Sequence, residues 1–318
     1  MTQDNQKAIG GYFELELPLH PELHAKAIAL NSGRFCFEYL LRCRKYNKVY
    51  VPYFTCNTAV EPIIKLGIPY EFYHIDKEYR IIDDIKLAED EALLYTNYWG
   101  LQNEYCEILA AKYDKQLILD YTQAFFSNPI SGIDTFYSCR KYFGVPDGGY
   151  LYTDAIADFE VEQDESYLRM DSLIKRIDLS PEAGYEAFHR VSALFHDMPI
   201  RRMSKLTQRL MQSIDYERVA QQRIDNYNKL RAALGGRELN YGEVPMIFPY
   251  ESAEGQQLRQ HLIANKVFVA KYWPNVDEWT EEDTTERWMA NHVLPLPIDQ
   301  RYDKEDMNRM FVTINNYE

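Results

Sequence analysis

The first half of the chain alternates regularly between short apolar runs rich in β-branched and aromatic residues and segments of helical period. Strands are expected at 48–53, 69–76, 91–98, 116–124 and 134–139, with helices at 57–67 and 104–113. Because parallel strands need right-handed crossover connections, this order predicts an α/β fold with a mostly parallel central sheet. In such open sheets the ligand site lies beyond the carboxyl ends of the strands.

The second half has a different organisation. Residues 204–236 carry apolar side chains near helical spacing, which predicts one long helix or a kinked pair that ends at Gly235. The segments that follow predict a strand at 244–250, a helix at 254–266, a strand at 267–273, a short run at 292–299 and a terminal helix at 304–317. We therefore expect a large domain over 1–215 and a smaller C-terminal α/β domain over 216–318.

Charge and composition exclude several classes of function. The chain has 35 Lys and Arg against 49 Asp and Glu, a net charge of −14, which argues against nucleic-acid binding. No apolar run approaches the roughly 18 residues of a membrane helix, and the N-terminus lacks a secretory pattern. The five cysteines are scattered and contain no C-x-x-C pair, so neither a disulfide framework nor a metal site is expected, and a cytoplasmic location fits best.

The stretch "FYSCRKYFGVPDGGYLYTD" places Lys141 between a strand and the glycine pair Gly148-Gly149. Taken alone, such a lysine is most often a solvated surface residue. However, Asp120 and Gln123 close the preceding strand in "DYTQA", and Ser138 lies three residues before the lysine. Together these residues form the set that an enzyme dependent on pyridoxal phosphate (PLP) requires.

Further segments occur in a matching order along most of the chain. They are "ALNSGRFCFEYLL", "VYVPYFTCNTAVEPIIKLGIPYEFYHID", "RRMS" and "HVLPLPIDQRYDKEDMNRM". With "DYTQA" and the lysine-to-glycine spacing, this order resembles that of the DegT-type nucleotide-sugar aminotransferases, which are fold-type I PLP enzymes. The resemblance implies a fold-type I PLP-transferase fold.

The resemblance also implies roles for individual residues. Lys141 would form the Schiff base with PLP and transfer protons during the reaction. Asp120 would keep the pyridine nitrogen protonated, and Gln123 would lie near the phenolic oxygen. The expected phosphate-binding residues are Ser32, Gly33 and Arg34 at the start of a helix, together with Ser138.

Structural interpretations of the same residues remain open at this point. Asp120 is also a typical residue for a strand end or a helix cap, and Gln123 for a turn. Ser32 fits a simple helix N-cap, Ser138 a buried strand serine, and Arg140 either an added phosphate ligand or a surface arginine.

The chain departs from the family pattern at two informative positions. Cys56 follows Thr55 where the family carries an aromatic residue that stacks on the cofactor ring, which leaves Tyr98 or Trp99 as alternatives. Ile200 replaces an asparagine that contacts the phosphate of the partner subunit, with Arg201 or Arg202 as possible substitutes.

By this resemblance, the protein is expected to be a homodimeric aminotransferase that uses PLP. The amino group would pass from an amino acid, glutamate in many family members, to a keto-sugar attached to a nucleotide, in polysaccharide or antibiotic-sugar biosynthesis. Two alternatives are a PLP enzyme acting on an amino acid or another non-nucleotide carbonyl, and a non-catalytic relative that keeps the fold.

Overall fold

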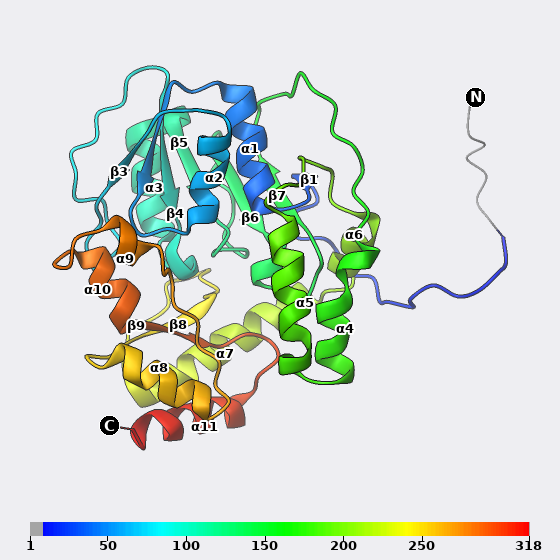
Figure 1. The fold of residues 1–318 in the computed structure, drawn as a ribbon, viewed down its shortest axis with the longest axis vertical. Helices are drawn as coiled ribbons and strands as arrows, with labels where there is room; N and C mark the ends of the chain where they lie inside the picture. Colours follow the sequence, from blue (N-terminus) through cyan, green and yellow to red (C-terminus); the bar gives the residue numbers. More distant parts are fainter. Residues whose placement is uncertain (1–8, 318) are drawn as a thin grey trace.

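The computed structural model describes residues 9–317 and contains a seven-stranded sheet with the strand order β1-β7-β6-β5-β4-β2-β3 (Figure 1). The strands are β1 (Ile28–Leu30), β2 (Lys48–Pro52), β3 (Tyr70–Tyr73), β4 (Glu91–Thr96), β5 (Leu117–Asp120), β6 (Asp134–Ser138) and β7 (Gly149–Tyr152). Strands β2 to β6 run parallel, whereas β7 is antiparallel to both of its neighbours. The sheet is therefore mostly parallel, as the sequence predicted.

Side chains of the sheet alternate between two buried faces, which is why its strands are apolar almost throughout. On β4, Ala92 and Leu94 pack with α1 (Gly33–Arg44) and α2 (Asn57–Lys65). The intervening Leu93 and Tyr95 belong to the other face, together with Cys106 and Leu109 of α3 (Asn103–Tyr113). Helices thus cover both faces of the sheet, and the carboxyl ends of the strands lie at its edge, outside these two layers.

A helical hairpin follows the sheet. It consists of α4 (Asp171–Asp178) and α5 (Pro181–Leu194), which lie side by side in Figure 1. Next come α6 (Lys205–Met211) and α7 (Tyr216–Leu234). Residues 204–236 thus form a pair of helices, which confirms the second of the two alternatives. The second helix begins where the Asp215 side chain accepts a hydrogen bond from the Arg218 amide. Helix α7 ends at Gly235, as predicted.

The C-terminal part packs around a two-stranded antiparallel sheet of β8 (Ile247–Glu251) and β9 (Val293–Pro297). Its remaining helices are α8 (Gly255–Ala264), α9 (Val276–Trp279), α10 (Thr285–His292) and α11 (Lys304–Asn315). Its buried side chains join those on one face of the seven-stranded sheet in a single core. No helix within 9–317 is long and apolar enough to cross a bilayer.

The strand predicted at 267–273 is wrong. Val267 and Val269 are buried while Phe268 and Ala270 are exposed, so the alternation that suggested a strand is present. However, the two-stranded sheet consists of β8 and β9 alone, and this segment does not enter its ladder. An alternating pattern reports which side chains are buried but not whether the backbone has a partner.

Candidate active site

The predicted site residues come from the carboxyl ends of neighbouring strands. Asp120 is the last residue of β5, and Ser138 is the last residue of β6. Lys141 lies in the short 3-10 helix Cys139–Lys141 directly after β6. Since β5 and β6 are parallel neighbours, their ends bring these groups to one edge of the sheet.

Thr122 joins Asp120 and Lys141. The Lys141 amine donates a hydrogen bond of 2.8 Å to the Thr122 hydroxyl, and the Thr122 backbone amide donates one of 2.8 Å to the Asp120 carboxylate. Asp120 and Thr122 are buried, whereas Lys141 is exposed. The site therefore has an accessible amine next to a buried carboxylate.

The buried carboxylate needs a nearby cation. Burial raises the pKa of Asp120, and the positive charge of Lys141 and the hydrogen bonds from Thr122 act in the opposite direction. A carboxylate away from water is costly to ionise unless it is paired or hydrogen-bonded. Lys141 and a protonated ring nitrogen are two cations that would meet this requirement.

The start of α1 is held against the glycine pair. The Ser32 hydroxyl caps α1 by accepting a hydrogen bond from the Phe35 amide, and the Gly148 amide donates to the Asn31 carbonyl. A Cβ on Gly149 would lie 2.5 Å from the Ser32 carbonyl carbon. Only glycine permits this approach, which explains the glycine pair after Lys141 and fixes the N-terminus of α1 near β6 and β7.

Of the expected phosphate-binding residues, Ser32, Gly33 and Ser138 come together. A Cβ on Gly33 would lie 2.9 Å from the Thr122 Cγ2 and 3.5 Å from the Ser138 Cβ. The first turn of α1 therefore lies beside Ser138 and Thr122. Such a helix N-terminus carries free amides that bind anions.

Three of the four arginines weighed for the phosphate have side chains that point elsewhere. The Arg34 guanidinium pairs with Glu61 at 2.6 Å and donates to the Phe195 carbonyl, so only its backbone belongs to the start of α1. Arg140 lies over the Phe195 ring at 4.5 Å and is not a free surface arginine; burial, and then the charge of Arg34, lower its pKa to about 10. Arg201 binds Asp164 at 3.4 Å.

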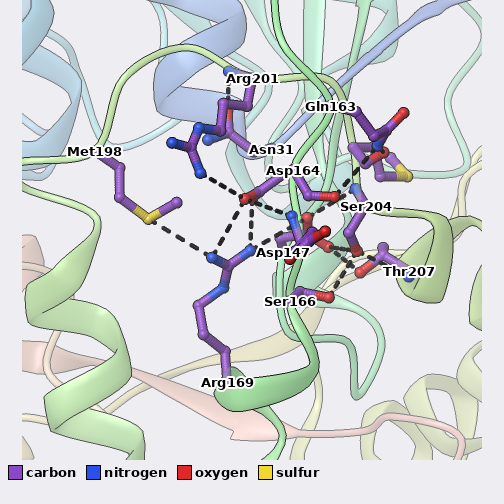
Figure 2. Close-up of polar contacts among 12 residues, drawn as sticks. Asn31, Asp147, Gln163, Asp164, Ser166, Arg169, Met198, Arg201, Ser204 and Thr207 are labelled. Atoms are coloured by element: carbon purple, nitrogen blue, oxygen red, sulfur yellow. Dashed lines mark hydrogen bonds and ion pairs between the residues drawn. The ribbon is translucent and has the colours of Figure 1, made fainter. Parts of the chain in front are cut away.

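A buried polar network lies behind the glycine pair (Figure 2). Asp147 accepts hydrogen bonds from the Ser204 amide, from the Ser204 hydroxyl and from Thr207. Arg169 lies between Asp147, at 3.6 Å, and Asp164, at 2.5 Å (Figure 2). The network ties the start of α6 to the loop that carries Gly148 and Gly149. Burial raises the pKa of Asp147 to about 6, against the effect of its hydrogen bonds and of Arg169.

Cys56 belongs to the site through its electrostatic environment. Burial raises the pKa of its thiol, and the charges of Lys141 and Asp120 both act on it. Cys56 also influences Tyr272, whose pKa is raised by burial and then by the Cys56 thiol.

Tyr98 and Trp99, the alternatives for stacking, are fixed in the core instead. Both are buried; the Tyr98 hydroxyl donates to the Phe54 carbonyl, and the Trp99 indole donates to the Tyr79 hydroxyl.

Gln123 is buried beside the site, and its amide oxygen accepts a hydrogen bond of 3.0 Å from the Trp99 amide. The amide nitrogen is then the donor that remains to Gln123. This orientation is compatible with a ligand that presents an oxygen acceptor.

Sequence reasoning missed Thr122, which contacts both Asp120 and Lys141. Thr122 had a signal, because it lies between Asp120 and Gln123 in a motif that was already singled out.

No protein-family model matches the chain, and no curated protein matches it in sequence. Solved structures do match it. The sugar aminotransferase CalS13 from Micromonospora echinospora is 13% identical, with a TM-score of 0.62, and the match covers 92% of this chain and 87% of CalS13. The chain has the fold of the sugar aminotransferases.

Two further structures agree. PseC of Helicobacter pylori, an aminotransferase involved in the biosynthesis of pseudoaminic acid, has a TM-score of 0.65 at 12% identity, covering 91% of this chain and 86% of PseC. The PMP-form of the putative sugar aminotransferase Spr1654 from Streptococcus pneumoniae has a TM-score of 0.63 at 11% identity, covering 92% and 87%. The expected fold-type I architecture, with a large domain and a smaller C-terminal α/β domain, is therefore confirmed.

Proposed function

We propose that the protein is a PLP-dependent aminotransferase that moves an amino group from an amino acid to a keto-sugar carried on a nucleotide. The observation that carries this proposal is the Lys141–Thr122–Asp120 chain of hydrogen bonds at the strand ends of a sugar-aminotransferase fold. It places an accessible amine and a buried carboxylate at one site.

The residues present suit PLP. An aldehyde needs an amine, a pyridine nitrogen needs a carboxylate partner, and a phosphate needs amide and hydroxyl donors. Lys141, Asp120 and the group of Ser32, Gly33 and Ser138 supply these three. The absence of a side chain at Gly33 keeps the space beside Thr122 and Ser138 open.

Each residue then has a role in the reaction. When bound, PLP supplies the electron sink that stabilises negative charge at the α-carbon of the donor. The Lys141 amine would hold the cofactor and, once freed by the donor, would accept the proton from the α-carbon. Asp120 would keep the ring nitrogen protonated, and the Gln123 amide nitrogen would donate to the phenolic oxygen.

The choice of substrates rests on similarity to proteins described as sugar aminotransferases. The donor proposed is glutamate, and the acceptor is a keto-sugar linked to a nucleoside diphosphate, for polysaccharide or antibiotic-sugar biosynthesis. Tyr272, whose pKa responds to the Cys56 thiol, is the aromatic residue proposed to lie against the cofactor ring.

The working unit is proposed to be a homodimer in the cytoplasm, built from protomers with a 1–215 domain and a 216–318 domain. Five large apolar side chains are exposed on the hairpin of α4 and α5, namely Ile174, Ile177, Tyr185, Phe188 and Leu194, and exposed apolar side chains favour association. The five free cysteines favour a reducing compartment.

The deciding experiment is an absorption spectrum of the purified protein with PLP, before and after borohydride. We expect a visible band from lysine-bound cofactor that borohydride removes, and its loss in Lys141→Ala. Lys86→Ala is the control, because Lys86 is exposed and pairs with Asp84 far from the site in sequence. A band that persists unchanged in Lys141→Ala would refute the assignment.

The substrates are tested by half-reactions. Glutamate should convert the loaded protein to the aminated cofactor, and a nucleoside-diphosphate keto-sugar should convert it back, whereas the free keto-sugar should not. Conversion by non-nucleotide carbonyls alone would identify a different PLP enzyme. Failure to bind PLP would favour a non-catalytic protein with this fold.

A further inference from the structure

Thr122 hydrogen-bonds the Lys141 amine. It is 7% exposed and lies between Asp120 and Gln123, and its hydroxyl accepts the 2.8 Å hydrogen bond from Lys141. A threonine hydroxyl can accept and donate at the same time. The Thr122 backbone amide donates a hydrogen bond of 2.8 Å to the Asp120 carboxylate. Thr122 therefore links the amine to the carboxylate, through its hydroxyl on one side and its backbone amide on the other.

The orientation of this hydroxyl is determined by packing. The Thr122 Cγ2 methyl faces Gly33, where an added Cβ would lie only 2.9 Å away. Threonine is restricted at χ1, and the backbone amide of Thr122 is held by Asp120. With the backbone and the methyl both in place, the hydroxyl has a defined direction, which is toward Lys141.

We propose that Thr122 is a positioning residue for Lys141: its hydroxyl holds the lysine amine beside Asp120 whenever the amine is not attached to the cofactor. This inference rests on the proposed function, in which Lys141 is released by the amino donor and must then act on a nearby proton. An exposed lysine has a long flexible stem, and ordering it is entropically costly. A fixed acceptor at 2.8 Å limits the positions that the free amine samples.

The test compares three variants. Thr122→Val removes the hydroxyl and keeps the shape, Thr122→Ser keeps the hydroxyl, and Thr135→Val is the matched control. Thr135 is a buried threonine of β6 whose hydroxyl donates to the Ile133 carbonyl. Thermal unfolding of all three shows whether each variant is folded.

Two measurements are made on each variant. On the PLP-loaded protein, the single-turnover rate constant with glutamate should fall roughly tenfold in Thr122→Val, the size expected for losing one hydrogen bond to a charged group. The glutamate concentration at half-saturation should change less than twofold, because the hydroxyl acts on the amine and not on the donor. Thr122→Ser should lie between the wild type and Thr122→Val, because it keeps the hydroxyl but lacks the methyl that orients it, and Thr135→Val should stay within twofold of the wild type in both.

The second measurement needs no cofactor. In the unloaded protein, the rate at which trinitrobenzenesulfonate modifies Lys141, followed by mass spectrometry of the Lys141 peptide, should rise several-fold in Thr122→Val, less in Thr122→Ser and not in Thr135→Val. Equal modification and turnover rates in Thr122→Val and the wild type would overturn the inference. If the wild type forms no borohydride-reducible link with PLP, the proposed function is overturned instead, and the modification rate still decides whether Thr122 holds the amine.

Discussion

At the scale of single residues, the site depends on contacts of a few ångströms that involve small side chains. Gly33 has no Cβ, so the first turn of α1 can lie beside Thr122 and Ser138. Thr122 then holds both Asp120 and Lys141. A substitution that adds one methyl group here changes the position of several groups at once.

The first prediction at this scale is that Gly33→Ala weakens PLP binding roughly tenfold, because overpacking by one methyl group costs about 1–3 kcal/mol. The added Cβ would meet the Thr122 Cγ2 at 2.9 Å and displace it. Binding is measured by titrating the absorption of the bound cofactor.

The control is Gly144→Ala, three residues after Lys141. A Cβ there would meet only the Leu173 Cδ2, at 3.8 Å, which is ordinary contact. PLP affinity unchanged in Gly33→Ala, or reduced equally in both variants, would contradict the crowding argument.

At the scale of elements, the loop between Lys141 and β7 is tied to α6 by the Asp147 network (Figure 2). Its members come from separate parts of the chain: Asp147 from the loop, Asp164 and Arg169 from the segment before α4, and Ser204 from the cap of α6. The network holds buried charges, so it should respond to pH.

We predict that Asp147 makes stability fall as the pH rises from about 4 to about 6. Burial raises the pKa of the folded carboxyl from 3.8 to about 6, so between these values the folded protein keeps a proton that the unfolded chain releases. The contribution is fully present below about pH 4 and is lost as the pH rises through about 6. It amounts to about 3 kcal/mol for a shift of about two units.

The measurement is the free energy of unfolding by urea between pH 4 and 7 for the wild type and Asp147→Asn. The free energy of unfolding of the wild type, taken relative to that of Asp147→Asn, should fall as the pH rises through this range, because asparagine does not titrate. Parallel pH profiles for the two proteins would show that Asp147 does not titrate in this window.

At the scale of the whole molecule, apolar side chains are exposed along α4 and α5. Phe195 directly follows α5, and its carbonyl accepts a hydrogen bond from Arg34 of α1. If this surface joins two protomers, the site and the interface are neighbours. Association would then bury side chains such as Ile177, which is 90% exposed.

The corresponding prediction is that sedimentation gives twice the protomer mass of 37.6 kDa, and that Ile177→Glu combined with Phe188→Glu shifts the protein to monomer. Burying two carboxylates in an apolar interface is unfavourable. Ile156→Glu, at a residue that is 89% exposed outside these helices, is the control and should leave the mass unchanged. A wild type that is monomeric at all concentrations would exclude the dimer.

Much of the architecture could be predicted from local patterns. The alternation of strands and helices predicted the parallel sheet, and the residues that close β5 and β6 led to Asp120 and Lys141. The prediction of the sheet succeeded because hydrophobic period, strand ends and glycine turns are properties of neighbouring residues. The segment 267–273 shows the limit of this reasoning, since its alternation is real but its backbone has no place in the sheet.

The sequence by itself therefore determined the order of the elements and the groups available at the sheet edge. Only the tertiary structure decided how these groups meet: that the Thr122 hydroxyl faces Lys141, and that the Arg34 guanidinium turns to Glu61. The physical reason is that side-chain direction and long-range contacts depend on the packing of segments far apart in the chain, which no local pattern encodes.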